Sequence, residues 1–455
     1  MRLMEREDFR MKENKMSRRS FLKVGAFASA AGMLAAAPAA ANAAAPNAAN
    51  AAEEENGLLG VFGGKLKYVF LFIGDGMGTA QIQSARFYKG TVENNGAVVE
   101  GELSFTQFPG VGSVTTYDST SFCPDSASTA TSIATGHKTE SGVINMCPWT
   151  RDVPYETIAE KLHAQKNYKV GVVSSVNIDH ATPAAFYAHQ ASRSNYYDIA
   201  CQMAQNDIDY LAGGGLLQPR GKDNRQPDAY ELARKNGYTV ARTVKEFEAL
   251  KPGTRAIAVA PNPTRQASLQ YEIDRAVAPN PLTLADFTRK GIELLQNPNG
   301  FFMMVEGGMI DWACHANDAA AAVQETIAFD RAVNVAVKFA ERHPGETLIV
   351  ITADHETGGL TLGHGQTPYL NDYSLLDRQK LSFQKFSAEV KKRKRSGLSF
   401  AEACKLVETN YGLDYGKLTT AEQAALKQAW EVSTQKRTLP EAEADELYGD
   451  HEPIT

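Results

Sequence analysis

A series of near-continuous apolar runs restricts the fold of this 455-residue chain more than any other feature. The clearest runs span residues 65–73, 168–174, 301–305 and 347–352, and a shorter run spans 208–212. Runs of this kind, without polar alternation, are typical of strands buried on both faces of a parallel sheet. Amphipathic or alanine-rich stretches with helical spacing separate them. The pattern therefore predicts an α/β protein with a mostly parallel central sheet.

Most of these runs are followed by side chains that can bind metals or do chemistry. The first run ends in Gly74-Asp75-Gly76-Met77-Gly78, and the second is followed by His180 and Thr182. Sites of open α/β sheets collect at the carboxyl ends of the strands, so these side chains are expected to face one cleft. Asp75 beside glycines is also a common turn residue. Thr182 before Pro183 also suits a helix cap.

The later runs carry two further pairs. Asp311 and His315 are four residues apart and share one face if a helix begins near Asp311, which suits a two-ligand grip on zinc. The alternative is that Asp311 only caps that helix. Asp354 and His355 directly follow the run 347–352, and both side chains reach a metal only if the backbone turns after them. Gly358 and Gly359 permit such a turn.

Ser126 lies in the stretch Cys123-Pro124-Asp125-Ser126-Ala127-Ser128. We expect it in the first turn of a helix that ends at Gly136. The free N–H groups of a helix start favour an anion, so a hydroxyl there can meet a phosphate. Asp-Ser before an alanine-rich run is by itself usually a helix cap. Arg193 lies one helix beyond His180, and its guanidinium can bind a phosphate through two parallel hydrogen bonds.

The first 52 residues have the parts of an export signal. Ser17-Arg18-Arg19-Ser20-Phe21-Leu22-Lys23 precedes an apolar run, 24–37, and a small-residue tract, 39–52. The string resembles a twin-arginine signal, which carries folded proteins across a membrane. The run is too short and too weakly apolar for a stable membrane anchor. We expect Met16 to be an alternative start, cleavage between Ala37 and Ala52, and a periplasmic or extracellular protein.

Composition excludes some functions. The formal net charge of −6 disfavours nucleic-acid binding, which usually needs a basic face. Five cysteines are too few for a disulfide scaffold. Cys123 and Cys147 either pair after export or remain free thiols.

Other segments carry weaker expectations. Residues 111–117 alternate like a strand. We expect the polar stretch 218–280 to leave the main sheet as an insertion within a core at 65–365. Residues 366–455 are expected to form a polar, helical insertion, with the basic run 391–395 on a solvated helix face.

Taken together, these motifs resemble the alkaline phosphatase family. The matching motifs are Gly74-Asp75-Gly76-Met77-Gly78, Pro124-Asp125-Ser126-Ala127-Ser128, His180-Ala181-Thr182-Pro183, Glu306-Gly307-Gly308, Asp311 with His315, and Ala353-Asp354-His355, over about 65–363. The resemblance implies a doubly wound α/β sheet flanked by helices, a homodimer, and hydrolysis of phosphate monoesters through a phosphoserine at Ser126. It implies two Zn²⁺ and one Mg²⁺.

Carried over by position, the ligands fall into three sets. The first zinc takes Asp311 and His315, the second takes Asp75, Ser126, Asp354 and His355, and the magnesium takes Asp75, Thr182 and Glu306. Arg193, His180 and Trp312 are expected to meet the substrate. His180 and Trp312 stand where enterobacterial members have Asp and Lys. Imidazole suits zinc better than magnesium, so zinc is an alternative third metal.

The family also supplies a further histidine to the first zinc from a strand near its C-terminus. We find no such strand, and therefore expect a C-terminally shortened chain, with His364 and His451 as candidate replacements. A phosphodiesterase of the same superfamily and a non-catalytic exported phosphate or metal binder are the competing functions. A sulfatase would need Cys or Ser in a Cys/Ser-x-Pro-x-Arg context, which Ser126 lacks.

Overall fold

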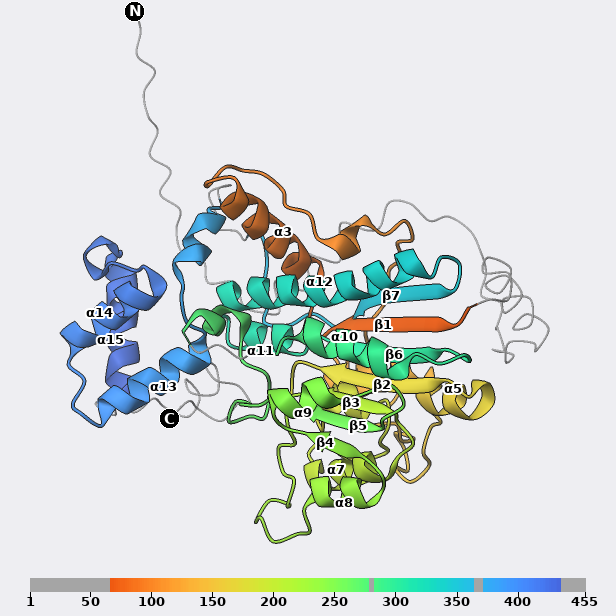
Figure 1. Ribbon diagram of the computed structural model, residues 1–455. Coiled ribbons are helices and arrows are strands. Elements are labelled where there is room, and N and C mark those ends of the chain that lie inside the picture. Colours follow the sequence, from red (N-terminus) through yellow and green to blue (C-terminus); the bar gives the residue numbers. More distant parts are fainter. Residues whose placement is uncertain (1–65, 278–281, 364–370, 435–455) are drawn as a thin grey trace, which may run out of the picture. The chain divides into compact units, whose positions relative to one another are not determined.

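The computed structural model describes residues 66–277, 282–363 and 371–434, and the export signal, His364 and His451 lie outside these ranges. Its centre is a seven-stranded sheet in the order β4-β5-β3-β2-β6-β1-β7, in which every pairing is parallel (Figure 1). The strands are β1 Tyr68–Gly74, β2 Lys169–Ser174, β3 Tyr210–Gly213, β4 Thr239–Ala241, β5 Ala256–Val259, β6 Phe301–Glu306 and β7 Thr347–Ala353. The strands predicted at the five apolar runs are therefore confirmed within a few residues.

Helices connect the strands and cover both faces of the sheet. The α-helices are α3 Thr79–Glu93, α4 Ser126–Thr135, α5 Ile158–Lys166, α6 Ala181–Ala184, α7 Tyr196–Gln205, α8 Ala229–Lys235, α9 Val244–Ala249, α10 Leu284–Leu295, α11 Met309–His315, α12 Ala319–Arg342, α13 Phe383–Lys394, α14 Phe400–Tyr411 and α15 Thr420–Ser433. Short 3₁₀ turns lie at Ser104–Gln107, Glu272–Ala276, Tyr373–Arg378 and Tyr415–Lys417.

Successive side chains of a strand point to opposite faces, and the core follows this alternation. Phe70 and Phe301 pack on one face together with residues of α10, α11 and α12. Phe302 and Met304 pack on the other face with residues of α4 to α8. Figure 1 shows α10, α11 and α12 over the same side of the sheet. The helices on both faces confirm the doubly wound α/β architecture.

Local signals explain where the helices begin and end. Asp125 caps α4 by accepting the Ser128 N–H, and Gly136 ends that helix with a φ of 76°, a left-handed conformation that suits glycine. Thr157 and Glu160 form a capping box, so α5 begins at Ile158.

Two expectations about weaker segments are wrong. Residues 111–117 form no strand and pair with none of the seven strands in the described chain. The stretch 218–280 contributes β4 and β5 to the sheet instead of leaving it. These two strands, Thr239–Ala241 and Ala256–Val259, have only three or four residues each. The polar composition of the surrounding stretch therefore hid their apolar pattern.

Strand β7 differs from the other long strands in its burial. Its sequence, Thr-Leu-Ile-Val-Ile-Thr-Ala, is almost wholly apolar, yet no residue in it is fully buried and Val350 is 40% exposed. The reason is its position, since within the described residues β7 pairs only with β1 and forms one edge of the sheet.

Beyond residue 366 the described chain has α-helices at Phe383–Lys394, Phe400–Tyr411 and Thr420–Ser433. This region contacts the core through carboxylates: Asp274 accepts hydrogen bonds from the Ser382 N–H and hydroxyl, and Asp318 accepts one from the Phe383 N–H. All five cysteines are free thiols, including Cys123 and Cys147.

None of the helices described here is both long enough and apolar enough to cross a bilayer.

Candidate metal and phosphate site

The carboxyl ends of four adjacent strands, β2, β6, β1 and β7, bring the candidate residues together. Asp75 follows β1, Glu306 ends β6, and Asp354 follows β7. All three carboxylates are buried, with at most 2% of each residue exposed. The sheet order therefore gathers side chains that lie up to 279 positions apart (354 − 75) at the carboxyl ends of the strands. Buried carboxylates at this density need compensating cations or hydrogen bonds.

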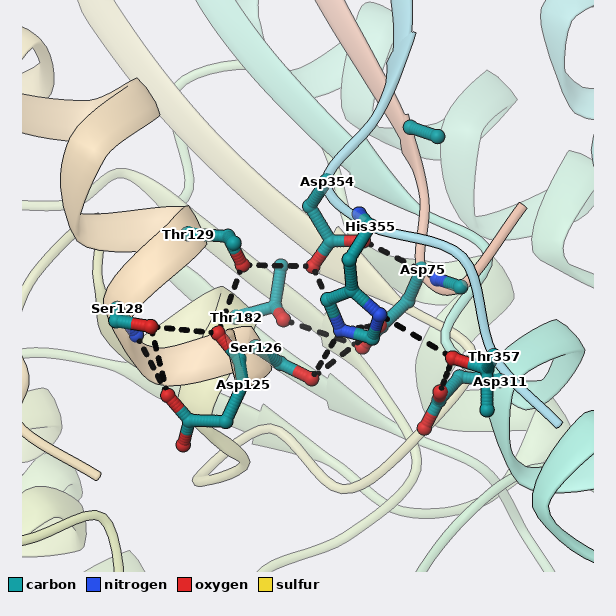
Figure 2. A network of polar contacts seen from close by, with 12 residues as sticks. Asp75, Asp125, Ser126, Ser128, Thr129, Thr182, Asp311, Asp354, His355 and Thr357 are labelled. Carbon is teal, nitrogen blue, oxygen red and sulfur yellow. Dashed lines mark hydrogen bonds and ion pairs between the residues drawn. The ribbon is translucent and has the colours of Figure 1, made fainter. Parts of the chain in front are cut away.

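Ser126 lies in the first turn of α4, as expected, and is only 4% exposed. Its hydroxyl donates to Asp75 Oδ1 at 3.2 Å and lies 3.3 Å from His355 Nε2 (Figure 2). His355 Nε2 is in turn 3.2 Å from Asp75 Oδ1. The hydroxyl therefore sits at the start of a helix and beside a carboxylate–imidazole pair.

Hydrogen bonds fix both carboxylate oxygens of Asp354. Its Oδ1 accepts the Gly76 N–H at 3.1 Å, and its Oδ2 accepts the Thr129 hydroxyl at 3.2 Å. Asp75, Asp354 and His355 have ligand atoms within 4.8 Å of one another, a geometry that could hold a metal ion. Gly358 and Gly359 both have positive φ values, of 72° and 63°, and turn the chain after this pair.

A second group shares Asp75. The ligand atoms of Asp75, His180 and Glu306 also lie within 4.8 Å of one another, and all three residues are buried. Thr182 donates its hydroxyl hydrogen to Asp75 Oδ2 at 3.3 Å, and Ser174 donates to Glu306 Oε2. Thr182 lies inside the short helix α6, whose N-cap is His180, so Thr182 is not the cap of this helix.

Burial and crowding change the pKa values of these groups. Burial and the Asp75 charge raise the pKa of Glu306 well above its usual range, and the same two causes raise the pKa of Asp354. Burial also opposes the charge on His355, but the Asp354 and Asp75 carboxylates raise its pKa to about 11. Burial and the Arg193 charge lower the pKa of His180 to about 3, so this imidazole is neutral.

The residues fit divalent cations. Glu306 Oε1 and His180 Nδ1 are buried with no hydrogen-bond partner among the described residues, and both belong to the group that shares Asp75. A neutral imidazole and carboxylate oxygens are ligands for Zn²⁺, and oxygen donors suit Mg²⁺. The raised carboxylate pKa values report an excess of buried negative charge, which a bound cation would neutralise.

Asp311 and His315 lie on one face of α11, where His315 Nε2 is 3.4 Å from Asp311 Oδ2. Asp311 does not cap this helix, since the N-cap is Gly308, so the capping interpretation is wrong. Asp311 Oδ1 accepts the Thr357 hydroxyl. Among the described residues, these two side chains form no three-ligand group with another His, Cys, Asp or Glu. The half-buried Trp312 packs edge-on against His180, with ring centroids 5.7 Å apart.

Arg193 pairs with Asp125, the residue that caps the helix of Ser126. Its Nη1 donates to Asp125 Oδ2 at 2.8 Å, and its Nη2 lies 3.1 Å from His180 Nε2. The Asp125 and Asp75 carboxylates raise the pKa of Arg193 against the effect of burial. The guanidinium is therefore held by Asp125, the residue directly before Ser126 in the sequence. The side chain of Arg193 is 26% exposed.

Several polar residues of this site were not expected from the sequence: Asp125, Thr129, Ser174 and Thr357. Asp125 could have been found from its capping position beside Ser126. The other three carry ordinary Ser or Thr signals, which are common in helices and turns, and only their contacts single them out.

A family model described as alkaline phosphatase matches residues 66–247 and 264–433 of the chain. Alkaline phosphatase 4 of Bacillus subtilis is 34% identical over 311 residues, which cover 66% of this chain and 63% of that protein. The tissue-nonspecific isozyme of human alkaline phosphatase is 31% identical over 332 residues, covering 64% and 63%.

Among solved structures, the cold-active alkaline phosphatase from a psychrophilic Shewanella species is 29% identical, with a TM-score of 0.67, and covers 81% of this chain and 87% of that one. The chain thus spans 63% of the length of the two curated relatives named above. The family model covers well over half of the chain and includes every residue of the site. The chain therefore belongs to the alkaline phosphatase family.

Proposed function

We propose that this protein hydrolyses phosphate monoesters to an alcohol and inorganic phosphate, with Ser126 as the nucleophile. The observation that carries the proposal is the position of the Ser126 hydroxyl. It is buried at the start of α4, 3.2 Å from Asp75 Oδ1 and 3.3 Å from His355 Nε2. A hydroxyl in such a place is oriented by its neighbours and faces the N–H groups of a helix start, which favour a phosphate.

The reaction has two displacements. Ser126 Oγ forms a bond to phosphorus while the bond from phosphorus to the alcohol oxygen breaks, and the alcohol leaves with a proton. A water oxygen then bonds to phosphorus as the Oγ–P bond breaks, which releases phosphate and restores the serine hydroxyl. Asp75 Oδ1 accepts the hydroxyl hydrogen in the resting site and so orients the Oγ lone pairs.

We propose two Zn²⁺ and one Mg²⁺ as cofactors. Asp311 and His315 would hold the first zinc, Asp75, Asp354, His355 and Ser126 the second, and Asp75, Thr182 and Glu306 the third ion. When bound, such ions supply positive charge that lowers the pKa of an attacking hydroxyl or water and stabilises the entering and leaving oxygens. The closeness of the neutral His180 to the third group makes Zn²⁺ an alternative there.

Arg193 would bind the phosphate during both displacements. Its guanidinium is paired with Asp125, directly before Ser126, and can turn two N–H groups toward equatorial phosphate oxygens. The N–H groups at the start of α4 would stabilise the same developing charge. Trp312 and His180, whose rings pack edge-on against each other, would contact the substrate beside Arg193.

The test is hydrolysis of an aryl phosphate at alkaline pH with added zinc and magnesium. Ser126→Ala should abolish turnover, by a factor of about 10³ or more, because no other nucleophile replaces the hydroxyl. Ser132→Ala is the matched control, since Ser132 lies further along the same helix. Among the described residues, its hydroxyl donates to the Ser128 carbonyl and not to a residue of the site. Trapping of labelled phosphate on Ser126 at low pH would identify the intermediate directly.

The same assay separates the competing functions. Faster hydrolysis of a bis-aryl phosphate than of the monoester would indicate a phosphodiesterase. Phosphate binding by folded, metal-loaded protein that turns over neither ester would indicate a non-catalytic phosphate binder. Each result would contradict the monoesterase proposal.

We propose that the protein acts as a homodimer outside the cytoplasm, exported by its twin-arginine signal. Exposed apolar side chains before the nucleophile's helix support self-association: Val111 is 94% exposed, Val114 69% and Phe122 96%. Sedimentation velocity would decide the oligomeric state, and a species with the mass of a single exported chain alone would contradict the dimer.

A further inference from the structure

Asp118 is a buried carboxylate that the reaction as described does not use. It lies eight residues before Ser126 in a segment without regular structure, and only 4% of it is exposed. Its Oδ1 accepts hydrogen bonds from the Thr120 N–H at 2.7 Å, the Thr120 hydroxyl at 2.9 Å and the Ser121 N–H at 2.6 Å. These bonds close a local turn, as Asp side chains often do.

The second oxygen of Asp118 reaches two other segments. Oδ2 accepts the Ser128 hydroxyl at 3.1 Å and the Ser141 hydroxyl. Ser128 lies in the first turn of α4, two residues after Ser126, whereas Ser141 lies in the loop that follows this helix. One carboxylate oxygen therefore connects the start of the nucleophile's helix to the loop beyond its end.

Both connections lead to the Asp125–Arg193 pair. The Ser128 hydroxyl also lies within hydrogen-bond distance of Asp125 Oδ1, at 2.9 Å. Gly142, next to Ser141, donates its N–H to Asp125 Oδ2 at 3.0 Å, and its carbonyl accepts the Arg193 N–H at 2.7 Å. The guanidinium of Arg193 donates to that same Oδ2 at 2.8 Å.

We propose that Asp118 is a positioning residue for phosphate recognition: by holding Ser128 and Ser141 it fixes Gly142 and Asp125, and through them the direction of the Arg193 guanidinium relative to Ser126. The inference rests on the proposed function, because it assigns Arg193 to the phosphate. Asp118 itself contacts neither the nucleophile nor the arginine in the hydrogen bonds described. In this proposal its effect on binding passes through Ser128, Gly142 and Asp125 to Arg193.

The charge of Asp118 agrees with this role. Burial alone would raise its pKa, but hydrogen bonds from Ser141, Thr120 and Ser121 lower the pKa below the usual value. An ionised carboxylate accepts these bonds more strongly than a neutral group would. Loss of the side chain leaves the Ser141 hydroxyl without this acceptor, leaves the Ser128 hydroxyl to Asp125 alone, and removes the link between the loop and the helix.

The experiment is a double-mutant cycle between Asp118 and Arg193. Asp118→Ala should raise the KM for an aryl phosphate and the Kd for inorganic phosphate about tenfold, and lower kcat less. In an Arg193→Ala background the same change should raise the Kd by less than about twofold, because the residue through which Asp118 acts is gone. Calorimetric titration with inorganic phosphate measures the Kd without turnover.

Two variants serve as controls. Asp118→Asn keeps a carbonyl acceptor for Thr120 and Ser121 and an amide that can donate to the hydroxyls, so it should restore the Kd to within about threefold of wild type. Asp228→Ala removes another Asp that accepts an N–H near the start of a helix, that of Tyr230 in α8. It should leave phosphate affinity unchanged, because Asp228 is not in the polar network around Ser126.

The outcomes separate this inference from the proposed function. An unchanged Kd in Asp118→Ala, or an equal loss in the Arg193→Ala background, would overturn the positioning role while wild-type turnover still supports the monoesterase. Absence of wild-type turnover would contradict the proposed function, whereas the phosphate titrations would still test Asp118. Should Asp118→Ala not fold, Ser141→Ala removes one link and should raise the Kd about two- to threefold only when Arg193 is present. No change in that variant would also overturn the inference.

Discussion

Ser126 Oγ and His355 Nε2 lie 3.3 Å apart, although 229 residues separate them in the sequence. Ser126 begins α4, and His355 follows β7, which pairs with β1. Asp75 follows β1, and its Oδ1 lies 3.2 Å from both Ser126 Oγ and His355 Nε2. Hydroxyl, imidazole and carboxylate therefore meet at one edge of a parallel sheet, where ligand sites of this class of fold collect.

Metal removal should destabilise the folded protein. The buried carboxylates Asp75, Asp354 and Glu306 repel one another without a cation, and metal binds the folded state selectively. With free metal at about 100 times its Kd, binding adds about 2.7 kcal/mol to the free energy of unfolding. Calorimetry with and without a chelator should show a melting temperature several degrees lower after chelation, restored by zinc and magnesium. An unchanged melting temperature would contradict a metal site here.

His180→Asp should change the metal preference of the group that contains Glu306 and Asp75. An imidazole nitrogen favours zinc and a carboxylate oxygen favours magnesium, so the bound Zn:Mg ratio should fall. Elemental analysis after dialysis against equal concentrations of both ions measures this ratio. His189→Asn is the control, because His189 pairs with Glu160 away from the site and its loss should not alter the ratio. The same ratio in both variants would remove His180 from the site.

Glu325 of α12 should make stability depend on pH. It is buried and accepts the Glu272 N–H, and burial with the charges of Glu272 and Asp274 raises its pKa to about 8. Since the unfolded pKa is about 4.3, the folded state holds the extra proton between these values. Stability is therefore greatest below the unfolded pKa and declines, by up to about 1.4 kcal/mol per pH unit, as pH rises toward 8.

Glu325→Gln should remove this decline, because the amide still accepts the Glu272 N–H but never ionises. Urea denaturation at pH 5 and pH 9 should show the variant gaining stability relative to wild type at the higher pH. Equal differences at both pH values would mean that Glu325 does not titrate in this range.

Export should depend on the paired arginines. Replacement of Arg18 and Arg19 together by lysine keeps the charge but removes the recognised pair, so most of the precursor should stay in the cytoplasm. Cell fractionation with an antibody to the protein measures the exported share. Replacement of Arg6 and Arg10, upstream of Met16, is the matched control and should leave export intact. Equal export of both variants would argue against the twin-arginine route.

Much of the fold and the site could be predicted from the sequence. The apolar runs 65–73 and 301–305 indicate buried strands, because a strand that is covered on both faces must be apolar on both. Asp75 and Asp354 follow directly from that pattern, since the carboxyl ends of parallel strands meet at the same end of the sheet, whereas Glu306 was expected from the resemblance to the family. Ser126 was placed by its cap and by the small residues after it. These signals are local, and periodicity and capping act within a few residues.

Tertiary structure alone decided which segments lie side by side. Residues 111–117 have a strand pattern but no neighbouring strand, the short runs 239–241 and 256–259 join the sheet, and the apolar β7 lies at its edge. Asp118 became recognisable only through partners such as Ser141. The capping position marks Asp125 in the sequence, but its pairing with Arg193, 68 residues away, appears only in the fold. Pairing and burial depend on competition among distant segments for the same contacts, and a local pattern records what a segment can do but not which partner it meets.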